Sequence, residues 1–146
     1  MRIIIETKVS SNVEEVFKGF NESLFLKLAP PFPLVKLKQF DGCHKGDTVH
    51  IELSFVLFKQ QWKSLIINFS KQENEIYFID KGIELPFFLK YWVHKHSIVK
   101  HNCATIIIDD IEYKTFNVVT DILFYPLMYL QFAYRKPIYQ KVFGKI

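Results

Sequence analysis

The stretch that most constrains the fold runs from Leu89 to Lys114, where apolar and polar residues alternate along two runs. These runs, Leu89–Lys100 and Cys103–Lys114, are separated by a polar tip at His101 and Asn102. A period of two places every second residue on the same face of a β-strand. The pattern therefore predicts a β-hairpin.

The turn sets the register of this hairpin. If Asn102 and Cys103 form a two-residue turn, His101 pairs with Ala104, and His96 lies opposite Asp109. The same register gives three more pairs on this face: Trp92 with Tyr113, His94 with Ile111, and Ile98 with Ile107. A face that mixes aromatic, aliphatic and a few polar groups suits the wall of a small-molecule pocket.

The rest of the chain is predicted to supply five more strands and three helices. A length of 146 residues suits a single domain, 1–146. The strands are predicted over Arg2–Val9, Leu34–Phe40, Gly46–Phe58, Trp62–Lys71 and Glu75–Lys81. Two short helices follow the first strand, and the second of these ends before Pro30 because proline blocks its continuation. A long helix is predicted from Asp121 to Phe143, with Asp121 as N-cap, Thr120 as the competing choice, and a bend or break at Pro137.

One face of the sheet needs a cover. The strand Gly46–Phe58 has a wholly apolar face and a largely polar one, so one side of the sheet is wet and the other is covered. The apolar face is formed by Val49, Ile51, Leu53, Phe55 and Leu57. The C-terminal helix is the only element long enough to cover it. The sequence therefore predicts an α+β fold in which a curved antiparallel sheet wraps round the long C-terminal helix.

This element order resembles the START-like or SRPBCC superfamily, which includes birch pollen allergen-like proteins, lipid-transfer START domains and polyketide cyclase-like proteins. It is most similar to bacterial ligand-binding SRPBCC proteins. The residues that carry the resemblance are Trp62, Asp80, Gly82, Pro86, Phe87, Trp92, His94, His96, Thr105, Asp109, Tyr113, Phe132, Tyr134 and Arg135. The resemblance implies a helix-grip fold with an apolar cavity. The chain departs from the pattern near residues 116–119, where relatives tend to carry Pro and Gly.

Composition and charge limit the classes of partner and the cellular location that we expect. The net charge of +4 is diffuse, without a basic block interleaved with aromatic residues, so nucleic acid is not an expected partner. Cys43 and Cys103 are isolated, as in reduced cytoplasmic proteins. The N-terminal run is too short for a signal peptide, and the longest apolar run, Ile122–Tyr134, is too short to span a bilayer. We therefore expect a cytoplasmic protein without stable membrane insertion, whose oligomeric state is left open.

The leading interpretation is a protein that binds a small apolar or amphipathic molecule and does not transform it. The 15 Phe and 7 Tyr supply apolar lining for core and pocket alike. The cavity would lie between the sheet and the C-terminal helix. The expected ligand-binding residues are Trp62, Phe87, Trp92, His94, His96, Asp109, Tyr113, Tyr129 and Phe132.

Three alternatives are open, and the first two use the same polar residues. His94, His96 and Asp109 have the residue types of a two-His, one-carboxylate metal site, but only their spacing supports it, so no metal and no cofactor are expected. They could instead act as acid–base groups of a cyclase- or dehydratase-like enzyme, although no nucleophile motif accompanies them and no catalytic residue is assigned. The last helix, with its aromatic side and basic end from Arg135 onwards, could also dock a peripheral lipid carrier on a membrane surface. Asp80 could contact Arg135 or the ligand, but as a lone carboxylate near an apolar hairpin it is expected to accept structural hydrogen bonds.

Overall fold

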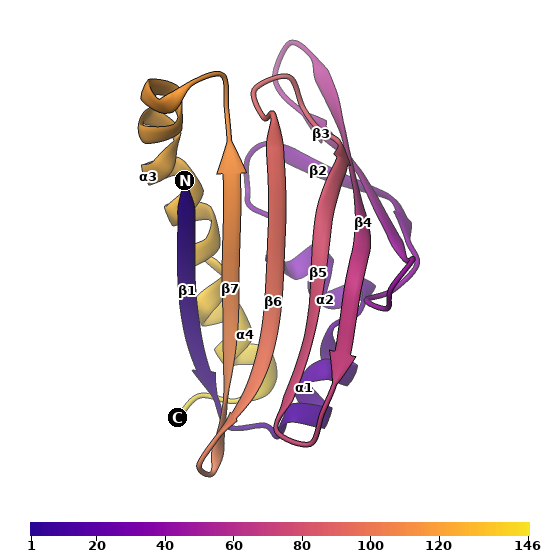
Figure 1. Ribbon diagram of the computed structural model, residues 1–146, viewed down its shortest axis with the longest axis vertical. Coiled ribbons are helices and arrows are strands. Elements are labelled where there is room, and N and C mark those ends of the chain that lie inside the picture. Colours follow the sequence, from indigo (N-terminus) through magenta and orange to yellow (C-terminus); the bar gives the residue numbers. More distant parts are fainter.

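The sheet forms one wall of the molecule. A computed structural model describes all residues, 1–146, and shows seven antiparallel strands in the order β1-β7-β6-β5-β4-β3-β2 (Figure 1). The strands are β1 (Arg2–Val9), β2 (Leu34–Phe40), β3 (Thr48–Ser54), β4 (Lys59–Lys71), β5 (Glu75–Glu84), β6 (Tyr91–His101) and β7 (Ala104–Lys114). From β2 to β7 each strand pairs with the next in sequence, and β1 closes the order beside β7.

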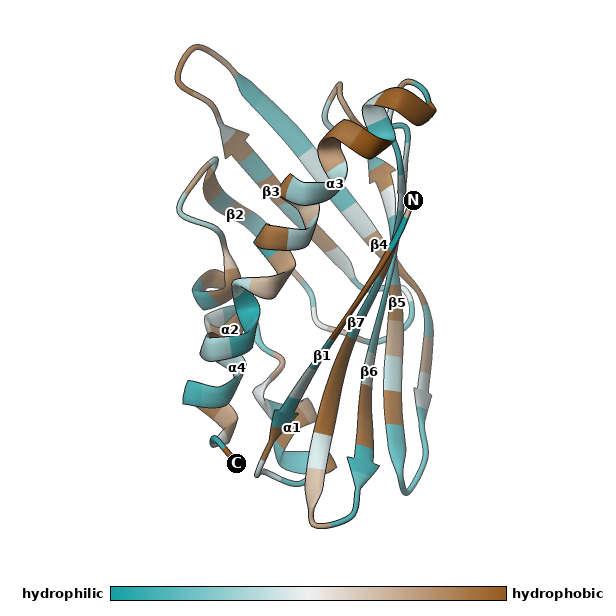
Figure 2. Ribbon diagram, turned by 90° about the vertical axis from the view of Figure 1, so that its left-hand side faces the viewer, coloured by the Kyte–Doolittle hydropathy of each residue, from teal (hydrophilic) through white to brown (hydrophobic).

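The helices lie on one side of this sheet. The helices α1 (Val13–Gly19) and α2 (Glu22–Leu28) connect β1 to β2. The helices α3 (Val118–Ala133) and α4 (Arg135–Phe143) follow β7 and run across the hollow side of the sheet (Figure 2). The predicted α+β arrangement, a curved antiparallel sheet round a long C-terminal helix, is confirmed. None of these helices combines the length and the apolar character needed to cross a membrane.

The predicted hairpin register is also confirmed. His101 pairs with Ala104, His96 pairs with Asp109, and Trp92 pairs with Tyr113. Asn102 in the turn has a φ of 55°, a left-handed conformation that asparagine tolerates better than most residues. The turn therefore places the alternating residues of both strands on the faces that the sequence predicted.

Two apolar clusters hold the C-terminal helices against the sheet. Tyr139 and Phe143 of α4 pack in a cluster with Ile98 and Ile107 of the central strands. Met128 and Phe132 of α3 belong to a second cluster, together with Ile3, Ile5, Leu89, Trp92, Ile111 and Tyr113. Gly19 permits close approach of α1 to α4, because a Cβ atom there would lie 2.3 Å from the Phe143 ring. The chain is thus packed tightly around α4.

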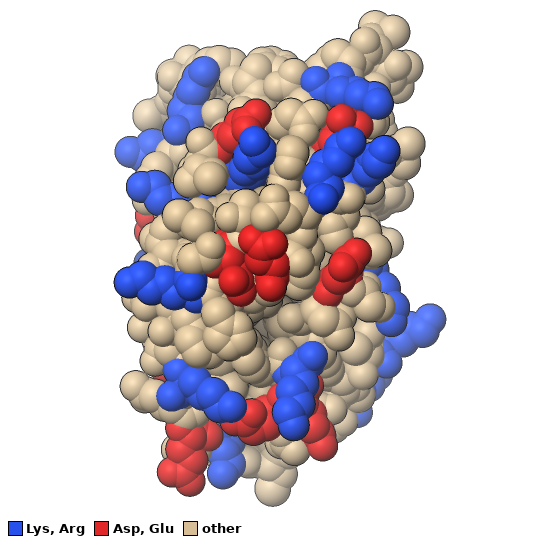
Figure 3. All heavy atoms as spheres, turned by 90° about the vertical axis from the view of Figure 1, so that its right-hand side faces the viewer, with Lys and Arg blue, Asp and Glu red and all other residues tan.

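The outer face of the sheet carries paired charges. Glu52 lies 3.2 Å from Lys59 and 3.7 Å from Lys38, and Lys63 lies 3.0 Å from Glu84. Figure 3, which shows the side of the molecule where β2, β3 and β4 lie, has basic and acidic side chains interspersed. The prediction that the polar residues of β3 face water is consistent with this distribution.

The strand boundaries around the β3–β4 turn differ from the prediction. The strand expected to reach Phe58 ends at Ser54, and β4 begins at Lys59, within the expected turn. A hydrogen bond from Phe55 N–H to the Phe58 carbonyl, 2.8 Å long, closes the actual turn. Val56 and Leu57 are 88% and 92% exposed, so Leu57 does not belong to the covered face. The apolar run concealed the turn because it lacks the usual Gly, Asn or Pro.

The strands β5 and β6 also differ at their ends. The sequence predicted that Gly82 ends β5, but the strand continues to Glu84. The strand predicted from Leu89 begins at Tyr91 instead, and Leu89 is buried in a tight connection in which its N–H donates to the Pro86 carbonyl at 2.9 Å.

The N-cap of the C-terminal helix lies four residues before the predicted one. Asn117 is the N-cap, and its side chain accepts a hydrogen bond from the Thr120 N–H at 3.1 Å. Asp121 instead lies inside the first turn and accepts 2.6 Å and 2.8 Å hydrogen bonds from the backbone N–H and the hydroxyl of Thr115. Asp121 therefore ties the end of β7 to the helix rather than capping it.

The expected interruption of the helix occurs just before Pro137. Helix α3 ends at Ala133 and α4 begins at Arg135. Pro137 has no N–H to donate to the carbonyl four residues earlier, which belongs to Ala133. A second proline, Pro126, lies in the interior of α3.

The cap assignment can be tested by mutation. Asn117→Ala removes the capping oxygen, so the free energy of unfolding should fall by about 0.5–2 kcal/mol. Urea denaturation followed by circular dichroism measures the change. Lys136→Ala, at an exposed position of α4, is the control and should stay within about 0.5 kcal/mol of the parent. An Asn117→Ala variant as stable as this control would contradict the assignment.

Candidate functional site

A cavity lies between the sheet and the helices. Its volume is about 630 Å³, and 25 of its 35 lining residues are hydrophobic. The strands β2 and β3 contribute Val35, Val49, Ile51 and Leu53. On the opposite side, α3 contributes Phe124, Leu127, Met128, Gln131 and Phe132. The apolar face predicted for the β3 segment is therefore largely a cavity wall.

Six of the nine expected ligand-binding residues line this cavity. They are Trp62, Phe87, Trp92, His94, His96 and Phe132. The two tryptophans meet edge to face, with ring centroids 4.8 Å apart, and Trp92 also packs on Phe132 at 5.8 Å. The sequence pattern thus identified one wall of the cavity.

The other three expected residues do not line the cavity. Tyr113 is completely buried beneath the start of α3, where its hydroxyl donates a 2.7 Å hydrogen bond to the Asp121 carbonyl. Asp109 is also buried, behind the histidines. Tyr129 is 42% exposed on the outer side of α3. Face alternation predicts the side of a strand or helix, but not which residues on that side are covered by others.

Sequence reasoning missed most of the opposite wall. The connection between α1 and α2, the helix α2 and the loop that follows it contribute Phe20, Asn21, Leu24, Phe25, Leu28, Ala29, Pro30, Phe32 and Pro33. Their helical apolar spacing was visible, but it equally fits packing against a solid core. Cys43, a buried thiol, also lines the cavity.

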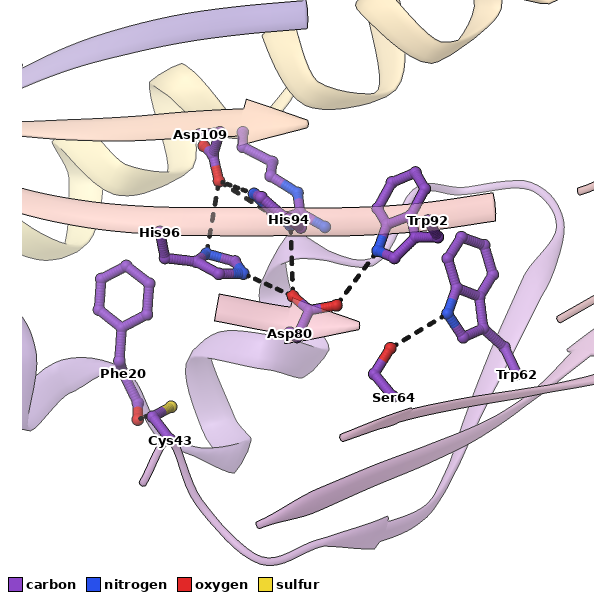
Figure 4. Close-up of polar contacts among 10 residues, drawn as sticks. Phe20, Cys43, Trp62, Ser64, Asp80, Trp92, His94, His96 and Asp109 are labelled. Atoms are coloured by element: carbon purple, nitrogen blue, oxygen red, sulfur yellow. Dashed lines mark hydrogen bonds and ion pairs between the residues drawn. The ribbon is translucent and has the colours of Figure 1, made fainter. Parts of the chain in front are cut away.

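A polar cluster interrupts the apolar lining on the sheet side (Figure 4). His94 Nε2 lies 2.9 Å from Asp109 Oδ1, and His94 Nδ1 lies 3.6 Å from Asp80 Oδ2. His96 Nε2 lies 3.0 Å from Asp80 Oδ2, and His96 Nδ1 lies 3.6 Å from Asp109 Oδ1. Each histidine therefore lies between the two carboxylates.

Neighbouring side chains orient this cluster. Trp92 Nε1 donates a 3.1 Å hydrogen bond to Asp80 Oδ1. The Phe78 ring stacks on His96, with centroids 4.4 Å apart. Arg135, expected near Asp80 or at the basic end of the last helix, instead lines the cavity, with its Nη1 3.8 Å from Asp109 Oδ1. Trp92 and His96 are the hydrogen-bond partners of Asp80, which was expected to accept structural hydrogen bonds.

The electrostatics of the cluster favour a neutral His94 beside ionised carboxylates. Burial, reinforced by the proximity of His96, lowers the pKa of His94 to about 4. Burial alone would raise the pKa of Asp80 and Asp109, but hydrogen bonds and charge interactions with the histidines lower the pKa of both. The cluster also contains one guanidinium, that of Arg135, on the side of Asp109.

The two thiols should differ in reactivity. Burial raises the pKa of Cys43 to about 12, whereas Cys103 is exposed in the β6–β7 turn. Because the thiolate is the reactive form, Cys103 should be alkylated at least tenfold faster than Cys43 between about pH 7 and pH 9. Peptide mass spectrometry after timed iodoacetamide treatment measures both rates, and equal rates would contradict the placement of Cys43.

Comparison with solved structures shows the same fold at low identity. Protein CV1439 from Chromobacterium violaceum matches with a TM-score of 0.70 and 14% identity, over 100% of this chain and 99% of that chain. Ara h 8.0201 matches with a TM-score of 0.65 and 12% identity, over 99% of both chains. A point mutant of norcoclaurine synthase from Thalictrum flavum, in complex with a transition-state analogue, matches with a TM-score of 0.61 and 14% identity, over 97% and 94%.

No protein-family model and no curated protein matches the sequence. The structural matches cover nearly the whole of this chain and of each matching chain. They confirm the predicted resemblance at the level of architecture: the chain has the helix-grip, START-like and birch pollen allergen-like fold.

Proposed function

We propose that this protein binds a small apolar or amphipathic molecule in the cavity between the sheet and the C-terminal helix, without transforming it. The observation that carries the proposal is a cavity of about 630 Å³ whose lining is mostly hydrophobic. This volume falls within the range of about 300–1,000 Å³ that is typical of small-molecule sites. Transfer of an apolar ligand from water into such a lining is favourable.

The position of the polar groups favours a ligand with one polar end. Asp80, His96, Gln131 and Arg135 line the cavity together with the aromatic and aliphatic side chains. A buried polar group costs free energy unless it has a partner, so a ligand should direct its hydrogen-bonding end towards these residues. Norcoclaurine synthase, which has the same fold, has been solved with dopamine and hydroxybenzaldehyde, both small aromatic molecules.

A matched pair of variants tests whether the cavity binds apolar molecules. Val35 lines the cavity, and the neighbouring Lys36 is exposed on the opposite face of β2. Val35→Trp should narrow the cavity and weaken binding of 8-anilinonaphthalene-1-sulfonate at least tenfold, whereas Lys36→Trp should bind it like the parent. Calorimetric titration of both variants, with folding checked by circular dichroism, measures the affinities. Equal affinity in both variants would show that the probe binds elsewhere.

The cyclase- or dehydratase-like alternative is separated from binding by the fate of the ligand. Native mass spectrometry of the purified protein, followed by solvent extraction, identifies any molecule that copurifies. A binder returns that molecule unchanged after incubation with excess protein, whereas an enzyme converts it. Conversion that disappears in His94→Gln would favour the enzyme.

A peripheral lipid carrier is a second candidate, favoured by exposed apolar residues at one end of the molecule. The β3–β4 turn and the start of α3 lie at the same end in both ribbon views (Figures 1 and 2). Five residues there are at least two-thirds exposed: Val56 88%, Leu57 92%, Val118 69%, Val119 67% and Leu123 70%. Phe58 and Phe116 from the same two segments line the cavity. The apolar end therefore adjoins the cavity, as a lipid entrance would require.

Vesicle binding tests this candidate. If the apolar end enters a lipid surface, Leu57→Ser should reduce cosedimentation with phosphatidylcholine–phosphatidylserine vesicles at least threefold, because it removes an inserting side chain. Leu26→Ser, at a 47% exposed position on α2, is the control and should sediment like the parent. No sedimentation of the parent protein would eliminate the carrier.

A further inference from the structure

We propose that Asp80, His94 and His96 form a binding site for one divalent transition-metal ion at the cavity wall. This site goes beyond ligand binding and does not depend on it. Sequence reasoning considered Asp109 as the carboxylate ligand and found only the spacing of the histidines to support a metal. The structure brings a different carboxylate, Asp80 of β5, to the two histidines of β6.

The geometry of the three ligand atoms fits a metal ion. Asp80 Oδ2 lies 3.0 Å from His96 Nε2 and 3.6 Å from His94 Nδ1. One ligand atom from each residue can be chosen so that all three lie within 4.8 Å of one another. Ligands bound at about 2.0–2.2 Å to one ion are roughly 3.0–3.5 Å apart, and the two distances to Asp80 Oδ2 are close to this spacing.

The hydrogen-bond requirements of the histidines point to the same atoms. All four ring nitrogens of the two histidines face carboxylate oxygens, at distances of 2.9–3.6 Å. Two of these nitrogens, His94 Nδ1 and His96 Nε2, face the same oxygen, Asp80 Oδ2. His96 Nδ1 is buried without a hydrogen-bond partner, and donation to Asp109 would satisfy it. An ion bound at His96 Nε2 would leave the single N–H of that ring at Nδ1, on the side of Asp109.

The surrounding residues have the arrangement of an outer coordination shell. Metal-bound histidines usually donate their second N–H to a carboxylate, and Asp109 lies in that position for both rings. Trp92 holds Asp80 through Oδ1, which leaves Oδ2 for the ion. Asp80 and His94 are paired across β5 and β6, so the backbone register holds the ligands together.

The donor set selects the class of metal. Two imidazole nitrogens and one carboxylate oxygen suit Zn²⁺, Fe²⁺, Co²⁺ or Mn²⁺, whereas Ca²⁺ and Mg²⁺ prefer oxygen ligands alone. All three ligand residues line the cavity, so the remaining coordination positions face the space available to a small molecule.

Metal titration of the full chain tests the site. The protein is stripped with EDTA, desalted and titrated with Zn²⁺ by calorimetry and with Co²⁺ by visible absorption. One equivalent of each ion should bind, and Asp80→Asn and His96→Gln should each weaken binding at least 100-fold. Asp109→Asn should weaken it by about 10–100-fold, because it removes the orienting carboxylate. His101→Gln, in the exposed turn, is the control and should bind like the parent.

Three outcomes would overturn the proposal. The first is no stoichiometric uptake of either ion by the parent, and the second is unchanged uptake in both Asp80→Asn and His96→Gln. The third is equal loss in His101→Gln, which would place the ion in the turn. Thermal unfolding checks that each variant folds. If Asp80→Asn does not fold, the result for His96→Gln decides.

Discussion

The pairing of β6 with its two neighbours is the constraint on which the site depends. Trp92, His94 and His96 alternate along β6 and therefore share the covered face of the sheet. The register with β5 sets Asp80 opposite His94, and the register with β7 sets Asp109 opposite His96. A shift of one residue in either pairing would turn a carboxylate to the outer face. The backbone ladder thus positions the polar cluster before any side chain contact forms.

Such a cluster is costly inside an apolar cavity. Ionised carboxylates lose hydration when they are buried, and attraction to their partners offsets this loss only where the geometry is good. Here the available partners satisfy the cluster incompletely, because Asp109 Oδ2 and His96 Nδ1 lack hydrogen bonds. Apolar residues of similar volume would fill the same space without this cost. The cluster is therefore better explained by a bound partner than by stability alone.

The two C-terminal helices divide the hollow of the sheet between core and cavity. Tyr139 and Phe143 of α4 fill one end completely, and both are buried with the isoleucines of the central strands. Helix α3 instead crosses towards the opposite end and leaves the space beside β2, β3 and β4 open to a ligand. The break between Ala133 and Arg135 lies where these two regions meet. Arg135 follows that break and reaches the polar cluster, so packing and function are linked at this point.

The sequence alone determined the succession of strands and helices along the chain, the hairpin register and the faces of the strands, because a period of two and a two-residue turn are local properties. It also identified His94 and His96 as a polar pair on an apolar face. The prediction for Asp121 was wrong, because this residue type is common at N-caps but here accepts hydrogen bonds from Thr115. The prediction for Leu57 was also wrong, because the apolar residues around it gave no sign of a turn.

Only the tertiary structure decided which carboxylate meets both histidines on the cavity side. Asp80 and Asp109 lie on opposite sides of β6, and both are compatible with its alternation. The curvature of the sheet and the packing of α4 bury Asp109 behind the rings, whereas Asp80 remains at the cavity. Curvature and helix packing depend on contacts between residues far apart in the chain, and a local pattern does not encode them.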